Sequence, residues 1–186
     1  YGNLVGYWNF DHNFSTTQNI TYDYSVGGND GNATNGTIYN ATGMYGATAQ
    51  FDSIDDYIIA SNMVTSTMRA SGYSISFFIR ANSLPAVTGI LSIQGGVSDS
   101  TPTFLIASNV NNTRLYTTDI YSNAISLSLN SWYQITATYS GDNNGRNATL
   151  YVNGGASKVS MNGTANQNAD ADLWIGNGYS GFFNGS

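Results

Sequence analysis

The sequence predicts an all-β protein, a two-sheet antiparallel β-sandwich of the jelly-roll type. Three observations support this fold class: a composition that disfavours helices, a series of short alternating segments, and turn residues between them. The chain has 21 glycines and 14 tyrosines, and its 11 acidic residues are all aspartate. Helix surfaces are usually rich in Glu, Lys, Gln and Ala, whereas aromatic residues and threonine favour strands. The 186 residues suffice for one domain with a substantial core.

The clearest strand signal lies in Trp132–Gly155. Within Trp132–Tyr139 the side chains alternate with period 2, which is typical of a half-buried strand. Leu150–Val152 repeats the alternation and runs into Asn153-Gly154, two residues that tolerate the positive φ of a tight turn. This stretch therefore predicts a β-hairpin.

Similar short segments recur along the whole chain, separated by Gly- and Asn-rich turns. In chain order we predict strands at Leu4–Phe10, Ala47–Phe51, Tyr57–Ala60, Tyr73–Ala81, Gly89–Ile93, Thr103–Ala107, Arg114–Thr118, Ala124–Leu127, Trp132–Tyr139, Ala148–Val152, Lys158–Met161 and Leu173–Gly176. This many short strands is typical of a sandwich. No linker divides the chain, so we expect one domain over residues 1–186.

Charge is scarce, at 9% of residues, and the net charge is −6. The five basic residues are scattered and cannot neutralise a row of phosphates, which argues against nucleic acid as a partner. No run of 18 apolar residues exists, so we expect no membrane insertion. Cysteine is absent, which excludes disulfides and thiolate metal sites.

The chain is rich in sequons for N-linked glycans, although the excess over the number that its composition gives by chance is less than twofold. The acceptor residues are Asn13, Asn19, Asn32, Asn35, Asn40, Asn111, Asn147, Asn162 and Asn184. Chance sequons in Asn- and Thr-rich loops are the simpler alternative, but covalent glycans would also keep a charge-poor surface soluble. We therefore predict a glycosylated protein that is extracellular or at the cell surface.

Seven segments, in order, resemble the signature blocks of one domain family. They are Val5–Asp11 (VGYWNFD), Asp23–Gly36 (DYSVGGNDGNATNG), Gly46–Ile58, Tyr73–Ser83, Leu129–Gly141, Leu150–Gly155 and Leu173–Ser186. The chain is similar to laminin-G-like domains of the concanavalin A-like lectin/glucanase superfamily. The resemblance implies a concanavalin A-like sandwich, in a family whose members bind sugars, proteins or calcium, or act as spacers.

The resemblance also implies a strand that is missing. In the family, the block matching Gly181–Ser186 is followed by a further strand that returns beside the first one. Without it, backbone groups and an apolar groove would stay open. We expect a neighbouring copy to donate a strand, with Tyr1–Phe10 as the only plausible donor, so that identical subunits form a homo-oligomer or filament. In the alternative, Leu4–Phe10 closes its own domain.

Catalytic chemistry is not expected. Glucanases that share this fold use a pair of glutamates, and this chain has none. The acidic cluster of Asp52, Asp55 and Asp56 lies in a turn, where Asp side chains accept backbone N–H groups. His12 is the only histidine, with no nucleophile elbow nearby. We predict that the protein is not an enzyme.

The sequence requires no cofactor, although two turns offer the oxygen ligands that calcium prefers. These turns contain Asp23, Asn29 and Asp30, and Asp142, Asn143 and Asn144. Neither has the spacing of a known calcium loop, so turns without metal are the simpler interpretation. Asp30 lies in the GNDG block that the family shares, and it is the candidate metal ligand.

Most of the 25 aromatic residues lie in predicted strands, where they serve the core. The candidates for contact with a sugar or a neighbouring subunit are Tyr116, Tyr121, Tyr179, Phe182 and Phe183. Two functions follow. We predict a non-catalytic structural protein, a glycosylated subunit of an extracellular filament or surface assembly. The alternative is a carbohydrate-binding or adhesive lectin-like module.

Overall fold

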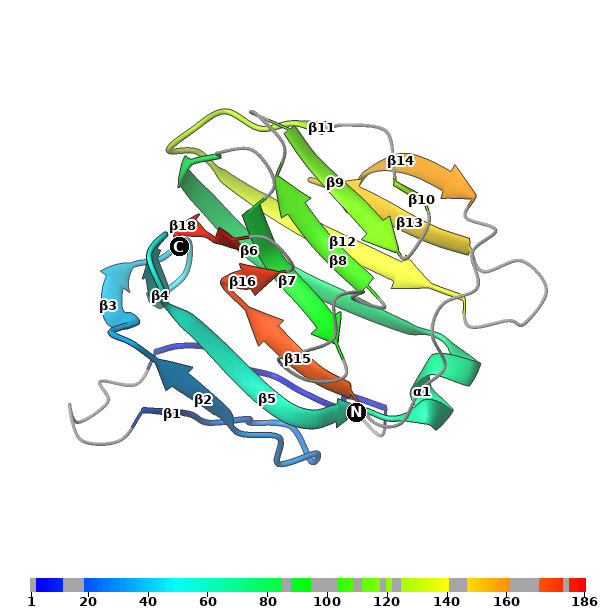
Figure 1. Cartoon of the computed structure of the whole chain (residues 1–186), viewed down its shortest axis with the longest axis horizontal. Helices are drawn as coiled ribbons and strands as arrows, with labels where there is room; N and C mark the ends of the chain where they lie inside the picture. Colours follow the sequence, from blue (N-terminus) through cyan, green and yellow to red (C-terminus); the bar gives the residue numbers. More distant parts are fainter. Residues whose placement is uncertain are drawn as a thin grey trace.

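The computed structural model describes residues 3–11, 19–84, 88–94, 104–108, 112–117, 120–121, 125–140, 147–160, 171–178 and 181–186. Two large antiparallel sheets form a sandwich (Figure 1), which confirms the predicted fold class. One short helix, α1 (Ser66–Ser71), occurs in these ranges, and Thr65 caps it by accepting the N–H of Met68. No helix in the described ranges is long and apolar enough to span a membrane.

The first sheet has the strand order β1-β2-β5-β15-β7-β8-β9-β10, with β11 also paired to β9. Its strands are β1 (Ile20–Thr21), β2 (Gly31–Thr34), β5 (Tyr57–Val64), β7 (Thr88–Gln94), β8 (Phe104–Ser108), β9 (Asn112–Thr117), β10 (Ile120–Tyr121), β11 (Ile125–Ser126) and β15 (Ala171–Ile175). Although β15 comes late in the chain, it lies between β5 and β7, so distant segments complete this sheet.

The second sheet has the order β14-β13-β12-β6-β18-β4-β3. Its strands are β3 (Ile38–Thr42), β4 (Ala47–Asp52), β6 (Tyr73–Ser83), β12 (Trp132–Tyr139), β13 (Asn147–Val152), β14 (Gly155–Ser160) and β18 (Asn184–Gly185). Two short strands, β16 (Asn177–Gly178) and β17 (Gly181–Phe182), form a separate pair.

The hairpin prediction is confirmed in detail. Strands β12 and β13 pair along their length, and a tight turn then leads into β14. The turn residues Asn153 and Gly154 have φ values of 49° and 77°, the left-handed geometry that an Asn-Gly turn supplies. Along β12, Ile135 and Ala137 are almost completely buried, so the predicted apolar register faces the core.

Both sheets contribute to one apolar core. Its most completely buried side chains include Ile58 and Ile93 from the first sheet, and Ile79, Ile135 and Leu150 from the second. Aliphatic side chains therefore fill the centre, while several aromatic rings pack around them. Trp8 and Phe10 are among the half-buried rings that contact this core, as the sequence predicted.

The predicted strand at Leu4–Phe10 is wrong. Within residues 3–11 the structure assigns no strand, and the backbone bond recorded to another segment is donated by Tyr24 N–H to the Tyr7 carbonyl, at 2.8 Å. Phe10 also has a φ of 57°, which interrupts an extended run. This segment is instead held by side chains of a neighbouring loop, described below. Strands β2 and β3, rich in Asn, Ala and Thr, were not predicted.

Candidate functional site

A carboxylate organises the loop between β1 and β2. Asp23 Oδ1 accepts the N–H groups of Tyr7 and Ser25, both at 2.8 Å. Its Oδ2 accepts the Ser25 hydroxyl and the Asn29 N–H, also at 2.8 Å each. Burial acts to raise the pKa of Asp23, but these hydrogen bonds outweigh it and bring the pKa below the ordinary 3.8. One ionised side chain therefore fixes the loop and the segment around Tyr7.

Further bonds tie the N-terminal segment to the same loop. The side-chain amide of Asn29 donates to the Val5 carbonyl at 2.6 Å, and Trp8 Nε1 donates to the Asn29 carbonyl at 3.1 Å. Because Trp8 also packs on the core, the loop is anchored to the body of the sandwich. These hydrogen bonds join the segment and the loop into one surface unit, which we call the Asp23 platform (residues 4–8 and 23–30).

The platform has a hollow of about 380 Å³ on its surface, lined by Leu4, Tyr7, Tyr24, Ser25 and Val26. Tyr7 is 52% exposed and Tyr24 is 47% exposed, although both belong to a well-bonded part of the chain. Small-molecule sites are typically concave and mainly apolar, with a few polar groups that fix orientation. The hollow fits this description, with two phenol rings as its main surfaces. These five described lining residues carry no charge.

The aromatic residues predicted for contact do not lie in this hollow. Phe183 is 2% exposed and packs against Phe51 with ring centroids 6.2 Å apart, so its prediction as a contact residue is wrong. It is buried because the last residues enter the second sheet. Phe182 is half-buried, 6.4 Å from the Tyr57 ring. Tyr116 and Tyr121 lie in β9 and β10, where only the backbone is described, and Tyr179 lies outside the described residues.

Sequence reasoning missed Tyr7 and Tyr24. A signal was present: Tyr7 lies in the opposite register to Trp8 and Phe10, which were assigned to the core. If that face turns inward, Tyr7 must turn outward. Tyr24 follows Asp23 directly, and the sequence alone does not show that this aspartate draws the two tyrosines together.

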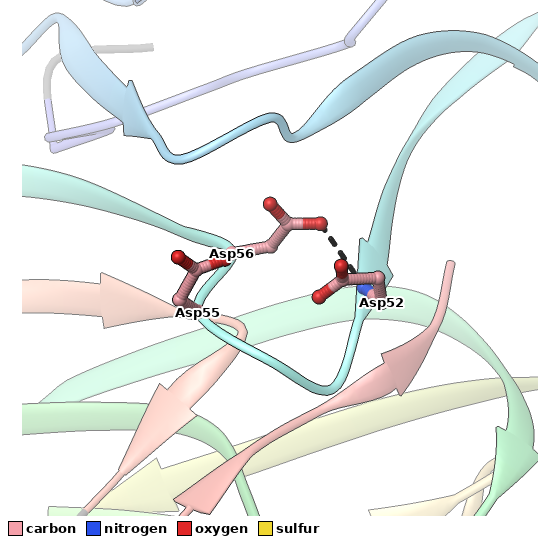
Figure 2. A group of neighbouring side chains, drawn as sticks. All are labelled: Asp52, Asp55 and Asp56. Carbon is pink, nitrogen blue, oxygen red and sulfur yellow. Dashed lines mark hydrogen bonds between the residues drawn. The ribbon is translucent and has the colours of Figure 1, made fainter.

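The cluster of Asp52, Asp55 and Asp56 lies at the turn between β4 and β5, with carboxylate oxygens within 4.8 Å of one another. The prediction that aspartate side chains cap this turn is confirmed for Asp52 and Asp56. Asp52 Oδ1 accepts the Ile54 N–H at 2.7 Å, and Asp56 Oδ2 accepts the Asp52 N–H at 3.1 Å (Figure 2). The turn is therefore built by its own aspartates.

Asp56 has unused bonding capacity. It is 3% exposed, and its Oδ1 has no hydrogen-bond partner among the described residues. Figure 2 shows this oxygen directed away from Asp52, and it lies on the side of Gly36 in the β2–β3 turn. Burial, and next the negative charge of Asp52, raise the pKa of Asp56 above its ordinary 3.8. Each of the three aspartates can offer one carboxylate oxygen within 4.8 Å of the others, which is a spacing that could hold a cation.

Asp30 was the predicted calcium ligand. Its side chain is exposed, and Oδ1 accepts the Asp23 N–H at 2.8 Å. The same loop uses both oxygens of Asp23 for its own bonds. Calcium binding at Asp30 stays a prediction. The second candidate turn, residues 142–144, and His12 lie outside the described residues.

The sequons differ in their surroundings. Asn19, Asn32 and Asn35 are exposed. Asn184 is half-buried in β18, where its amide donates to the Asp52 carbonyl at 3.4 Å. The remaining sequon residues fall outside the described residues or have no described side chain: Asn13, Asn40, Asn111, Asn147 and Asn162. Asn184 is thus the least accessible acceptor among the described side chains.

The two-sheet sandwich defines a lectin-type β-sandwich domain. The chain belongs to the concanavalin A-like lectin/glucanases superfamily, whose family model Laminin_G_3 matches residues 52–186. This confirms the resemblance seen in the sequence. Comparison with curated proteins finds no match.

Solved structures share the fold at low identity. Domain 4 of an extracellular GH43 arabinanase from Geobacillus stearothermophilus, in complex with arabinotriose, is 16% identical with a TM-score of 0.68, covering 98% of this chain and 87% of that one. A Trypanosoma rangeli sialidase in complex with 2,3-difluorosialic acid is 14% identical, with a TM-score of 0.70 and coverages of 100% and 29%. The binding domain of botulinum neurotoxin DC in complex with SialylT is 16% identical, with a TM-score of 0.59 and coverages of 90% and 43%.

Proposed function

We propose that this domain is a carbohydrate-binding, lectin-like module that holds a sugar in the hollow of the Asp23 platform. The observation that carries the proposal is the pair of exposed tyrosines, Tyr7 and Tyr24, on a platform that the hydrogen bonds of Asp23 hold in place. The superfamily is consistent with this function, as are two similar solved structures, the arabinanase domain in complex with arabinotriose and the neurotoxin binding domain in complex with SialylT.

The lining of the hollow indicates the class of sugar. Phenol rings bind the apolar face of a ring by contact, and Leu4 and Val26 extend that apolar surface. An acidic sugar would need a cation or convergent N–H donors, and none of the described residues that line the hollow is charged. We therefore infer a neutral sugar as the ligand. Because the platform is already bonded, little conformational entropy is lost when a ligand binds.

The module is proposed to be non-catalytic. Glycoside hydrolysis requires two carboxyl groups that flank the scissile bond, and among the residues that the structure describes no carboxyl group lines the hollow. The carboxylates of Asp52 and Asp56 in the β4–β5 turn accept backbone N–H groups, which supports a structural role for them.

Binding can be tested with a neutral oligosaccharide array, followed by calorimetric titration of any positive sugar. Tyr7→Ala and Tyr24→Ala should each weaken binding by about tenfold or more, since a hot-spot aromatic contributes at least 1.4 kcal/mol. Tyr45→Ala is the matched control, because Tyr45 is 72% exposed but does not line the hollow. Unchanged binding in both hollow variants, or no binding to any neutral sugar, contradicts the proposal.

We also propose that the protein is extracellular and carries N-glycans. The exposed sequons at Asn19, Asn32 and Asn35 support this. Intact mass before and after enzymatic removal of N-glycans measures the occupancy. Peptide mapping should find Asn184 unmodified, because a glycan there would have to leave the centre of a sheet. A protein from its native source without any glycan mass contradicts the proposal.

A structural subunit of a filament or surface assembly is the second candidate function. It would require a strand exchanged between copies, and Tyr1–Phe10 is the predicted donor. The predicted donor, however, is engaged in its own domain, because Tyr7 and Val5 bond to Asp23 and Asn29. Donation of this segment would break these bonds, which argues against it. Electron microscopy of the purified protein would reveal fibres if the subunit assembles by itself.

A further inference from the structure

The outer face of the second sheet carries an arginine beside an indole ring. In β6 the side chains of Ile79 and Ala81 are buried in the core, so Arg80 and Phe78 project from the opposite, outer face. Phe78 is 42% exposed there. Arg80 pairs with Trp132 of β12, and its guanidinium carbon lies 5.8 Å from the centroid of the Trp132 ring. A cation–π contact therefore holds the guanidinium at the surface of the sheet.

Arg80 has no anionic partner among the described residues. Its side chain makes no hydrogen bond or ion pair with them, and its Nε is buried without an acceptor. In sequence, Arg80 is also the only charged residue of β6, β12 and β13. The chain has 11 acidic and five basic residues, so carboxylates are in excess and an unpaired arginine is unexpected. A guanidinium that has lost part of its hydration gains free energy when an acceptor binds to it.

An aromatic surface adjoins this guanidinium. Phe78 is two residues from Arg80 on the same face of β6, about 7 Å along the strand. The ring of Tyr45, in the β3–β4 turn, packs edge to face against Phe78 with the centroids 5.4 Å apart, which fixes the Phe78 ring. Gln134, the exposed cross-strand neighbour of Phe78, adds an amide to the same face. A planar ring can thus lie on Phe78 while a group attached to it reaches Arg80.

We propose that this surface binds an acidic sugar through the carboxylate of that sugar. We call it the Arg80 face, and it consists of Phe78, Arg80, Trp132 and Gln134. An arginine held against an aromatic ring presents its terminal nitrogens in one plane, which matches the two oxygens of a carboxylate. The other basic residue in the strands of this sheet is Lys158 of β14, three strands away from β6. One cation favours the single charge of a carboxylate over the nearly double charge of a phosphate.

A uronic acid has the required chemistry, because its sugar ring itself carries the carboxylate. The ring packs on Phe78, its carboxylate pairs with Arg80, and its hydroxyl groups bond to the amide of Gln134. This site is separate from the hollow of the Asp23 platform, whose described lining residues carry no charge. The two sites therefore select different sugars, and the acidic site does not depend on the neutral one.

The test titrates the protein into labelled tetragalacturonate and labelled tetraglucuronate, with fluorescence anisotropy as the measurement. We expect saturable binding of at least one of them, and the affinity should fall as sodium chloride is added because salt screens the ion pair. The methyl ester of the same sugar has no charge and should bind at least about tenfold more weakly. Binding of neither uronate, or equal binding of the acid and its ester, overturns the proposal.

Arg80→Gln should weaken uronate binding by about tenfold or more. Arg80→Lys should weaken it less, since lysine keeps the charge but lacks the planar fork. Lys158→Gln is the matched control, because it removes one positive charge from the same sheet and should leave the affinity unchanged. Equal losses in Arg80→Gln and Lys158→Gln would show that binding reflects only the net charge, which overturns the proposal.

Phe78→Thr tests the aromatic half of the site and replaces Arg80→Gln if that variant does not fold. Phe78 lies on the exposed face of β6, and its loss should weaken uronate binding by about fivefold or more. Unchanged affinity in Phe78→Thr contradicts the assigned surface. Tyr7→Ala, which alters the hollow, should leave uronate binding unchanged, so failure of the neutral-sugar site and failure of the Arg80 face are told apart. Loss of uronate binding in Tyr7→Ala would place the acidic sugar in the hollow and overturn the proposal.

Discussion

The loop at Asp23 and the turn at Asp56 use the same side chain with opposite results. Asp23 accepts four hydrogen bonds and has a lowered pKa, whereas Asp56 accepts one from Asp52, keeps an unpartnered buried oxygen and has a raised pKa. Burial raises the pKa in both cases, and the negative charge of Asp52 raises that of Asp56 further, whereas the N–H and O–H donors around Asp23 lower its pKa. A carboxylate stabilises a turn only when enough donors face it. The candidate sugar site lies on the loop of Asp23, the carboxylate that accepts four hydrogen bonds.

The largest expected effect comes from Asp23→Ala. This change removes the acceptor of four hydrogen bonds and leaves half-buried N–H groups unpaired, so the free energy of unfolding should fall by about 2–4 kcal/mol at pH 7. Urea denaturation measures it. Asp30→Asn is the control, since Asp30 accepts the Asp23 N–H and an amide oxygen can still do so. A loss below about 1 kcal/mol would show that the loop is held by other contacts.

A smaller effect of opposite sign is expected from Asp56→Asn. An amide keeps an acceptor for the Asp52 N–H and removes a buried charge, so the free energy of unfolding should rise by about 1 kcal/mol at pH 7. The raised pKa means that the native protein binds this proton more tightly than the unfolded chain. The stabilisation from the proton is complete below about pH 3.8 and is lost as pH rises through the native pKa. The gain of the variant should therefore shrink as pH falls toward 3.8.

Asp23→Asn provides the mirror image of that pH profile. Its native pKa is lowered, so the carboxylate stabilises the fold above pH 3.8, and this stabilisation is lost as pH falls through the native pKa. The loss in the free energy of unfolding caused by Asp23→Asn should thus shrink as the pH falls below 3.8. The gain caused by Asp56→Asn, in contrast, should appear only as the pH rises above 3.8. If the free energy of unfolding changed with pH in the same direction in the two variants, the contrast between the Asp23 loop and the Asp56 turn would be refuted.

The smallest effect is expected from Trp8→Phe, which removes the hydrogen bond to the Asn29 carbonyl but keeps an aromatic ring against the core. The free energy of unfolding should fall by about 1 kcal/mol in urea denaturation. Tyr7→Phe is the matched control, because Tyr7 bonds to Asp23 through its backbone N–H, which the change leaves in place. Equal losses in both variants would mean that the Trp8 bond adds nothing to the platform.

Local patterns predicted the regular part of the fold. The alternation in Trp132–Tyr139 and the turn at Asn153-Gly154 predicted β12, its pairing with β13 and the buried face. Alternation at Leu4–Phe10 misled, since the same pattern arises when a segment is held by side-chain acceptors such as Asp23. The alternation of apolar residues indicates which face of a segment is buried. It does not indicate whether the backbone N–H groups of that segment bond to another strand or to a side chain.

The candidate site was harder to predict for the same reason. Tyr7 and Tyr24 are brought together by Asp23, whose partners at Tyr7 and Asn29 are 16 and 6 residues away. Phe183 was misplaced because its burial depends on β18 entering the sheet between β4 and β6, strands that precede it by about a hundred residues. Contacts of this range leave no local signal in a sequence.

The position of β18 also has a consequence for folding. Residues 184–186 lie in the interior of the second sheet and pair with β4 and β6, strands that are about a hundred residues away in the sequence. The middle of this sheet therefore forms only when contacts of long sequence range are made. Such contacts close long loops, so we expect folding to be slow relative to a protein of local contacts.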